Sequence, residues 1–288
     1  MYPAEFEYFR VKTLAEASRL LRRRKGSRLL AGGHSLLPVM KLRLSEPGAL
    51  IDIGGLRGLT GIQAKGKTLV VGAMTTHAAV ASSPVVAKLC PLLAETASQI
   101  GDVQVRNRGT IGGSLAHADP AADYPTAILA LDATIVVRGA RGERKIPAQK
   151  FFLDLFTTAL KPGEILTSVV VPAYAKGMGG AYVKHRHPAS SYAVVGAAAL
   201  VELSGGVCKR VNLAVGGASA TPVRASEAES ELAGRRPDTE SIEAAAARAA
   251  SAVADPLSDT YASGEYRLHL ATVLAKRALT QAVARAKG

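Results

Sequence analysis

"LLAGGHSLLPVMKLRL", residues 29–44, is the stretch from which the fold of this chain can be argued. A short apolar run ends at Leu30, and Gly32 and Gly33 follow it closely, ahead of His34 and Ser35. Glycine has no Cβ, so it adopts positive φ without strain and lets a ligand approach the backbone. Consecutive backbone N–H groups in such a turn attract anionic oxygens. The stretch therefore predicts a strand followed by an anion-binding loop.

A second loop of the same kind lies in "RNRGTIGGSLAHADPAADYP", residues 106–125, where Gly112 and Gly113 precede Ser114. Two such loops can hold a diphosphate from opposite sides, and serine hydroxyls add rotatable donors. Neither loop matches the Walker A or GxGxxG pattern, so the familiar nucleotide folds are not indicated. A glycine pair is also typical of a tight turn, and this alternative stays open. The other glycine pairs, interpreted as turns, hinges or close packing, are at 54–55, 179–180, 205–206 and 216–217.

The composition is that of a folded protein of two or three domains. Of the 288 residues, 48% are hydrophobic and 20% are charged, which argues against disorder. The formal net charge of +13 favours an anionic partner. Cys90 and Cys208 lie far apart and outside any CxxC motif, which argues against a zinc site or an iron–sulfur cluster held by this chain. With no secretory leader and no apolar run of membrane-spanning length, the sequence predicts a cytoplasmic protein.

Hydrophobic periodicity divides the chain near residue 178. Before this point short strands and helices alternate, with a capping box at Thr13 and Glu16, one helix over 84–99 and an irregular segment over 101–122. After it, three strands lead into three alanine-rich helices, which suggests a separate α+β domain. The expected strands cover 180–187, 192–203 and 207–215, and the expected helices cover 222–234, 239–253 and 264–286.

The two glycine loops resemble the paired flavin-binding signatures of the FAD-binding medium subunit of molybdenum hydroxylases, the family of aerobic carbon monoxide dehydrogenases and xanthine dehydrogenases. The resemblance extends through "FEYFRVKTLAEAS", "GEILTSVVVP" and "NLAVGGASATPVRASEAE". It implies an α+β fold with a FAD-binding domain of the PCMH or vanillyl-alcohol-oxidase type, built from two α/β subdomains at 1–55 and 56–177. Residues 178–288 would form a C-terminal α+β domain with a three-stranded sheet and a helical bundle.

The resemblance also implies which residues bind FAD. Asp123 matches a contact on the adenosine side, Leu166 an apolar contact to the ring system, and Tyr192 an aromatic residue against the isoalloxazine. Each keeps a structural alternative: a helix N-cap for Asp123, a core position for Leu166 and an ordinary strand aromatic for Tyr192. The implied cofactor-binding residues are Leu30, Ala31, Gly32, Gly33, His34, Ser35, Leu36, Thr110, Ile111, Gly112, Gly113, Ser114, Asp123, Leu166, Lys184 and Tyr192.

No catalytic residue and no metal ligand is assigned to this chain. His117 with Asp119 and Asp123 lacks a fourth ligand, and His185 and His187 alternate along one predicted strand. No Ser-His-Asp or Cys-His arrangement stands out. That is expected if a flavin supplies the chemistry and the protein supplies orientation and electrostatics.

The function implied by the resemblance is electron transfer. A large molybdenum–pterin subunit would oxidise the substrate, a small subunit with [2Fe–2S] clusters would relay electrons, and FAD on this chain would pass them to quinone, NAD or oxygen. The complex would be a dimer of heterotrimers, in the cytoplasm or peripheral to the inner face of the membrane. Ser190 and Ser191 stand before Tyr192 where carbon monoxide dehydrogenases usually carry Gly-Asp, which argues against carbon monoxide as substrate.

Two other interpretations stay open. One is a free-standing FAD-dependent oxidase of the same superfamily, which would need a substrate pocket of its own. The other is a basic nucleic-acid-binding module. It is disfavoured, and no nucleic-acid partner is expected, because the chain lacks the clustered aromatics of the usual stacking platforms.

Overall fold

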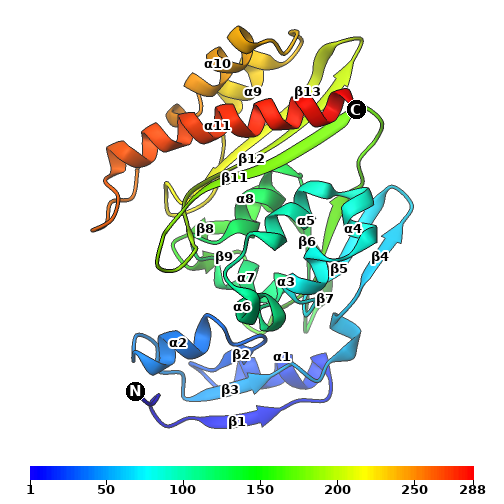
Figure 1. Cartoon of the computed structure of the whole chain (residues 1–288). Coiled ribbons are helices and arrows are strands. Elements are labelled where there is room, and N and C mark those ends of the chain that lie inside the picture. Colours follow the sequence, from blue (N-terminus) through cyan, green and yellow to red (C-terminus); the bar gives the residue numbers. More distant parts are fainter.

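Three larger sheets follow one another along the molecule, and the computed structural model describes all residues 1–288 (Figure 1). The first sheet is parallel, with the order β1-β3-β2. Its strands are β1 (Glu7–Arg10), β2 (Arg28–Leu30) and β3 (Ala49–Asp52), and its helices are α1 (Leu14–Arg23) and α2 (Leu36–Lys41). This part packs around a small hydrophobic core that includes Val11, Ala17 and Ile51 and extends to Ile165 of the next sheet. The first sheet forms the layer at the N-terminal end of the molecule (Figure 1).

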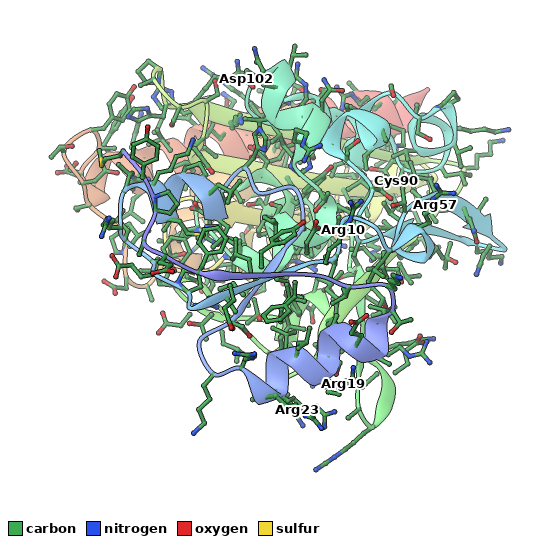
Figure 2. All side chains as sticks on the ribbon, turned by 90° about the horizontal axis from the view of Figure 1, so that it is seen from below. Arg10, Arg19, Arg23, Arg57, Cys90 and Asp102 are labelled. Atoms are coloured by element: carbon green, nitrogen blue, oxygen red, sulfur yellow. The ribbon has the colours of Figure 1, made fainter.

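Helix α1 begins where the sequence places its cap. The Thr13 hydroxyl accepts a hydrogen bond from Glu16 N at 3.1 Å, which satisfies one of the free N–H groups of the first turn. The Glu16 carboxylate accepts from Lys12 N at 2.9 Å, one residue before the position of an ideal capping box. Arg19 and Arg23 project from this helix in the view from below (Figure 2). Arg22 and Arg23 lie in its last turn, where cations suit the helix dipole.

The second sheet is antiparallel, with the order β4-β5-β10-β6-β7. Helices α3 to α8 pack on it and on one another. Its strands are β4 (Ile62–Lys65), β5 (Thr68–Gly72), β6 (Thr134–Gly139), β7 (Gly142–Pro147) and β10 (Ile165–Pro172). The helices are α3 (His77–Ala81), α4 (Pro84–Leu89), α5 (Pro91–Ser98), α6 (Val103–Arg108), α7 (Ile111–His117) and α8 (Asp123–Ala130). Short elements complete this part: η1 (Arg57–Leu59), η2 (Ala148–Lys150), β8 (Phe152–Asp154) and β9 (Thr157–Thr158).

Two sequence-based predictions are wrong in this part. The single helix expected over 84–99 is two helices, because Pro91 has no N–H with which to continue α4. The segment 101–122, expected to be irregular, contains α6 and α7. Asp102 caps α6 and Thr110 caps α7 through their side-chain oxygens. The glycines of α7 lower its helix propensity, but tertiary hydrogen bonds at its first turn override this local preference.

The third sheet has the order β11-β12-β13-β14, and the chain's longest helix, α11, lies across it (Figure 1). The predicted three long strands are present, and the two-residue β14 adds a fourth at the edge. The strands are β11 (Met178–Arg186), β12 (Ala193–Ser204), β13 (Val207–Gly216) and β14 (Val223–Arg224). The helices are α9 (Ser226–Leu232), α10 (Thr239–Ala247), η3 (Ala250–Ala252) and α11 (Gly264–Lys287).

The third sheet also packs against α5 and α8 of the second part, and the hydrophobic core continues across this contact. Glycines make the approach close: an added Cβ on Gly216 would lie 1.9 Å from Thr126 Oγ1 on α8. On α5, Glu95 pairs with Arg285 of α11 at 2.7 Å. The three sheets fall within 1–55, 56–177 and 178–288, and these ranges stay a prediction of the domain boundaries.

Candidate functional site

The two glycine loops meet in the structure. Gly32 lies against the backbone that joins α6 to α7: an added Cβ would stand 2.1 Å from Arg108 O and 2.8 Å from Gly109 Cα. An added Cβ on Gly113 would stand 3.5 Å from the Ala31 Cβ. Segments about eighty residues apart in the sequence therefore form one surface between the first and second parts. The absence of side chains at Gly32 and Gly113 permits this approach.

The first loop offers free hydrogen-bond donors. None of the backbone N–H groups of residues 31–35 donates to another backbone group. Gly33 has φ +76°, a left-handed conformation that glycine adopts without strain. His34 Nδ1 lies 3.0 Å from Gly32 O, within this same turn. A run of unpaired N–H groups at a glycine turn is the arrangement that binds anionic oxygens.

The second loop differs, and the expectation of two equivalent donor loops is wrong in this respect. Ile111 N donates to Thr75 O at 3.1 Å and Gly112 N donates to Ala73 O at 2.8 Å. Gly113 N donates to the Thr110 hydroxyl at 3.1 Å. These amides hold α7 against the second sheet and are not free for a ligand. The second loop is thus held rigidly and lies close to the first loop, while the first loop provides the free N–H donors.

Asp123 and Lys184, both predicted site residues, bind each other. Asp123 is the first residue of α8, and the cap preceding it is Ala122. The Lys184 Nζ lies 2.9 Å from Asp123 Oδ1, and the two side chains are 1% and 5% exposed. Tyr182 donates its hydroxyl to Asp123 Oδ1 at 2.6 Å. Burial raises the pKa of the Asp123 carboxyl, while Lys184 and Tyr182 oppose this shift.

Tyr192 lies between the first loop and this buried pair. Its side chain is 39% exposed. Burial raises the pKa of the Tyr192 phenol, the charges of Asp119 and Asp123 raise it further, and the nearby Ser35 hydroxyl opposes them. Tyr192 is the last residue of the connection between β11 and β12, so the third sheet places this aromatic side chain near the loop that follows β2.

Leu166 is a core residue on β10, 4% exposed. The register of β10 shifts between Leu166 and Ser168, and the intervening Thr167 O accepts from Ala73 N at 2.9 Å. Ala73 O in turn accepts from Gly112 N. A short chain of backbone contacts therefore links this irregularity to the second glycine loop, and a cofactor contact at Leu166 stays a prediction.

The electrostatic setting of the loops is mildly basic. Burial lowers the pKa of His77 to about 4, with the charges of His34 and Arg106 acting in the same direction. The Arg106 guanidinium donates to Ile100 O at 2.9 Å, so it is fixed beside the loops. Burial also lowers the pKa of His117, whose ring packs 5.1 Å from that of Phe156.

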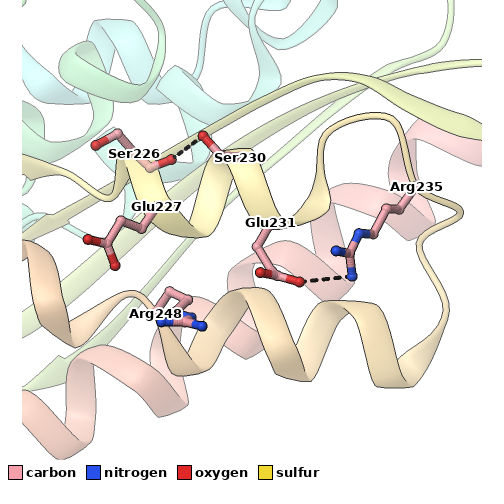
Figure 3. A pocket seen from close by; sticks show the side chains of 6 residues that line it. All are labelled: Ser226, Glu227, Ser230, Glu231, Arg235 and Arg248. Carbon is pink, nitrogen blue, oxygen red and sulfur yellow. Dashed lines mark hydrogen bonds and ion pairs between the residues drawn. The ribbon is translucent and has the colours of Figure 1, made fainter.

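Other features of the surface lie away from the loops. A polar depression lined by Ser226, Glu227, Ser230, Glu231, Arg235 and Arg248 lies between α9 and α10 (Figure 3). Its Glu231 and Arg235 pair at 2.8 Å. No group of three or more His, Cys, Asp or Glu side chains is placed to hold a metal ion. None of the helices combines the length and the apolar character needed to cross a bilayer.

Sequence reasoning missed several residues that shape the site. Tyr182 precedes Lys184 by two residues and shares its strand face, so the two-residue period of a strand was the signal for it. Gly196 pairs with Lys184 across the sheet and leaves room for the Tyr182 hydroxyl, which would lie 2.5 Å from a Cβ at that position. Thr75 and Ala73 bind the second loop through their carbonyls, and no local pattern marks them.

Comparison with known proteins matches this architecture over nearly the whole chain. Residues 4–174 match the FAD binding domain in molybdopterin dehydrogenase, and residues 180–282 match the CO dehydrogenase flavoprotein C-terminal domain. The chain therefore belongs to the family of FAD-binding subunits of molybdopterin dehydrogenases. It is the flavoprotein component of an oxidoreductase, and its cofactor is FAD.

Individual relatives align with this chain over almost the full length of both proteins. The carbon monoxide dehydrogenase medium chain of Hydrogenophaga pseudoflava is 41% identical over 99% of each chain. The 6-hydroxypseudooxynicotine dehydrogenase complex subunit alpha of Paenarthrobacter nicotinovorans is 38% identical over 100% of this chain and 97% of that one. A solved structure of the Hydrogenophaga pseudoflava carbon monoxide dehydrogenase, lacking the Mo-pyranopterin moiety, superposes with a TM-score of 0.96 at 42% identity, covering 99% of each chain.

Proposed function

We propose that this chain is the electron-transfer subunit of a heteromeric molybdenum hydroxylase and passes electrons from [2Fe–2S] clusters on a partner to an external acceptor. The observation that carries the proposal is the pair of glycine loops: the unpaired backbone N–H groups at 31–35 lie beside Gly113, which has no side chain and approaches Ala31. A flavin dinucleotide carries a diphosphate, and these features fit that group. Bound FAD supplies the ability to accept and release electrons singly or in pairs.

The chain's own residues have separate tasks in this proposal. The N–H groups of residues 31–35 hold the diphosphate oxygens. Gly32 and Gly33 keep the backbone within reach of those oxygens. Tyr192 lies along the ring system, where an aromatic plane adds packing area. The charge of Arg106 favours the anionic ligand.

The proposed partners are a large molybdenum–pterin subunit and a small iron–sulfur subunit, assembled as a dimer of heterotrimers. Both cysteines of this chain are buried, so neither is available to a cluster on its surface. The relatives named above are subunits of enzymes with chemically unlike substrates, carbon monoxide and a nicotine derivative. We therefore assign substrate choice to the large subunit, and quinone, NAD and oxygen stay the candidate acceptors.

The first test is the cofactor. The purified chain should be yellow, and denaturation should release FAD in a stoichiometry of one per chain. Identification of the released flavin by chromatography distinguishes FAD from FMN. A colourless chain that binds no added FAD would contradict the proposal.

The second test is assembly and electron flow. Co-expression with large and small subunits should give one complex in size-exclusion chromatography. Flavin reduction by substrate should require the iron–sulfur subunit. The isolated chain should not oxidise an aldehyde or alcohol. Turnover by the isolated chain with oxygen would favour the free-standing oxidase instead.

A further inference from the structure

We infer that Tyr182 and Lys184 are positioning residues that fix Tyr192 over the first glycine loop through a buried chain of hydrogen bonds. The chain runs from Tyr182 to Asp123, from Asp123 to Lys184, and from Lys184 to the carbonyl of Ser191. This inference rests on the proposed function in that Tyr192 is taken to lie along the flavin ring. The contacts themselves are a property of the chain alone.

The Lys184 ammonium joins two parts of the molecule. It donates to Asp123 Oδ2 at 3.0 Å and to Ser191 O at 2.7 Å. Asp123 begins a helix of the second part, whereas Ser191 belongs to the connection between β11 and β12. The Lys184 side chain is only 1% exposed, so water does not compete for its hydrogen bonds to Asp123 and Ser191. Hydrogen bonds to a charged group are among the stronger ones in proteins.

Ser191 is the residue through which Lys184 acts on Tyr192. Its φ is +61°, a left-handed conformation that is uncommon for a residue with a Cβ. The Lys184 ammonium holds its carbonyl in this conformation. His187 N donates to Tyr192 O at 2.8 Å, and Ala193 N donates to Ala121 O at 3.1 Å. The turn that carries Tyr192 is thus anchored on both sides, and Lys184 holds the one strained residue.

Tyr182 holds the other end of the chain in place. Its own backbone is fixed by α5, because Glu95 accepts from Tyr182 N at 3.0 Å and Gln99 donates to Tyr182 O at 3.0 Å. Its hydroxyl then orients Asp123 toward Lys184. The residue opposite Lys184 on β12 is Gly196, and a Cβ there would meet the Tyr182 hydroxyl at 2.5 Å. The sheet therefore leaves a slot for this hydroxyl.

The experiment places a reporter at Tyr192 in the full-length chain without FAD. The sequence contains no tryptophan, so a Tyr192→Trp variant carries a single indole whose acrylamide quenching reports its mobility and exposure. Tyr182→Phe and Lys184→Met are added to this background. Tyr124→Phe is the matched control, because the Tyr124 hydroxyl is equally buried on α8 and has no hydrogen-bond partner.

In Lys184→Met we expect a larger fraction of molecules in which the reporter indole has left its position and is open to acrylamide. This fraction should rise about tenfold, since loss of a charge-assisted hydrogen bond has an effect of this order. Tyr182→Phe should give a smaller rise in the same direction, and Tyr124→Phe none. If Lys184→Met fails to fold because Asp123 is left unpaired, the double variant Asp123→Asn/Lys184→Met removes both charges and should show the same rise. Quenching identical to the reporter background in folded variants would overturn the inference.

A second readout separates this inference from the proposed function. FAD titration of the same variants, with Tyr192 restored, should give weaker binding for Lys184→Met than for Tyr124→Phe. If quenching changes but FAD binds to no variant or parent, the positioning chain stands and the proposed function fails. If FAD binds but quenching is unchanged, the proposed function stands and the positioning chain fails.

Discussion

Gly32→Ala is the substitution that tests the loop contact most directly. The added methyl would stand 2.1 Å from Arg108 O and 2.8 Å from Arg108 C and from Gly109 Cα, and side-chain Cβ atoms essentially never approach closer than 3.0 Å. All three neighbours are backbone atoms. The connection between α6 and α7 cannot simply retreat, since Gly109 itself lies against the His77 ring. The two loops must therefore separate.

The expected cost follows from this geometry. Overpacking of this kind destabilises a fold by about 1–3 kcal/mol. Separation also moves the N–H groups of residues 31–35 away from the second glycine loop. Losing one or two charge-assisted hydrogen bonds to the diphosphate weakens FAD binding by about tenfold to a hundredfold. A tenfold to hundredfold loss corresponds to about 1.4–2.7 kcal/mol, so the losses of affinity and of stability should be similar in size.

Two measurements check this expectation. Titration of the FAD-free protein with FAD, followed by flavin fluorescence, gives the dissociation constant, and circular dichroism of the FAD-free protein gives the melting temperature. Gly48→Ala is the matched control: it lies in the same part of the chain, has no positive φ, and an added Cβ meets nothing within 4 Å. If Gly32→Ala binds FAD as tightly as Gly48→Ala, the two loops do not form the diphosphate site.

Four further outcomes are expected. Gly33→Ala (φ +76°) should bind FAD more weakly than Gly26→Ala (φ +75°), since both share the backbone strain but only Gly33 lies in the loop; equal affinities would remove Gly33 from the site. Thr110→Ala should lower the stability of the FAD-free chain by about 1 kcal/mol through loss of a helix cap, whereas Thr110→Ser should retain it, as thermal melting would show. The pKa of His77 falls from 6.5 to about 4 on folding, so stability should be full above pH 6.5 and decline by about 2–3 kcal/mol as pH falls toward 4; His77→Phe should flatten that decline in urea titrations. Burial raises the pKa of the Cys90 thiol to about 12, so a thiol reagent should leave Cys90 unmodified in the native chain and modify it after denaturation, as mass spectrometry would detect.

The sequence alone determined the class of fold and the location of the loops. The glycine pair after β2 and the change of pattern near residue 178 are local signals, because strand alternation, caps and turns depend on residues close in the chain. The Thr13 cap and the three long strands of the C-terminal domain follow from such signals. The resemblance to the flavoprotein family rested on the same two loops, and the family comparison confirms it.

Only the tertiary structure decided which groups remain free to bind. The two loops look alike as sequence, yet the amides of Ile111 and Gly112 are taken by the carbonyls of Thr75 and Ala73, which local patterns do not bring near. The same long-range hydrogen bonds hold α7 helical where glycine favoured an irregular segment. The pairing of Asp123 with Lys184, 61 residues apart, arises because α8 packs on the third sheet. Because Asp123 and Lys184 are buried, their charges are not solvated by water. They form hydrogen bonds that orient neighbouring groups instead.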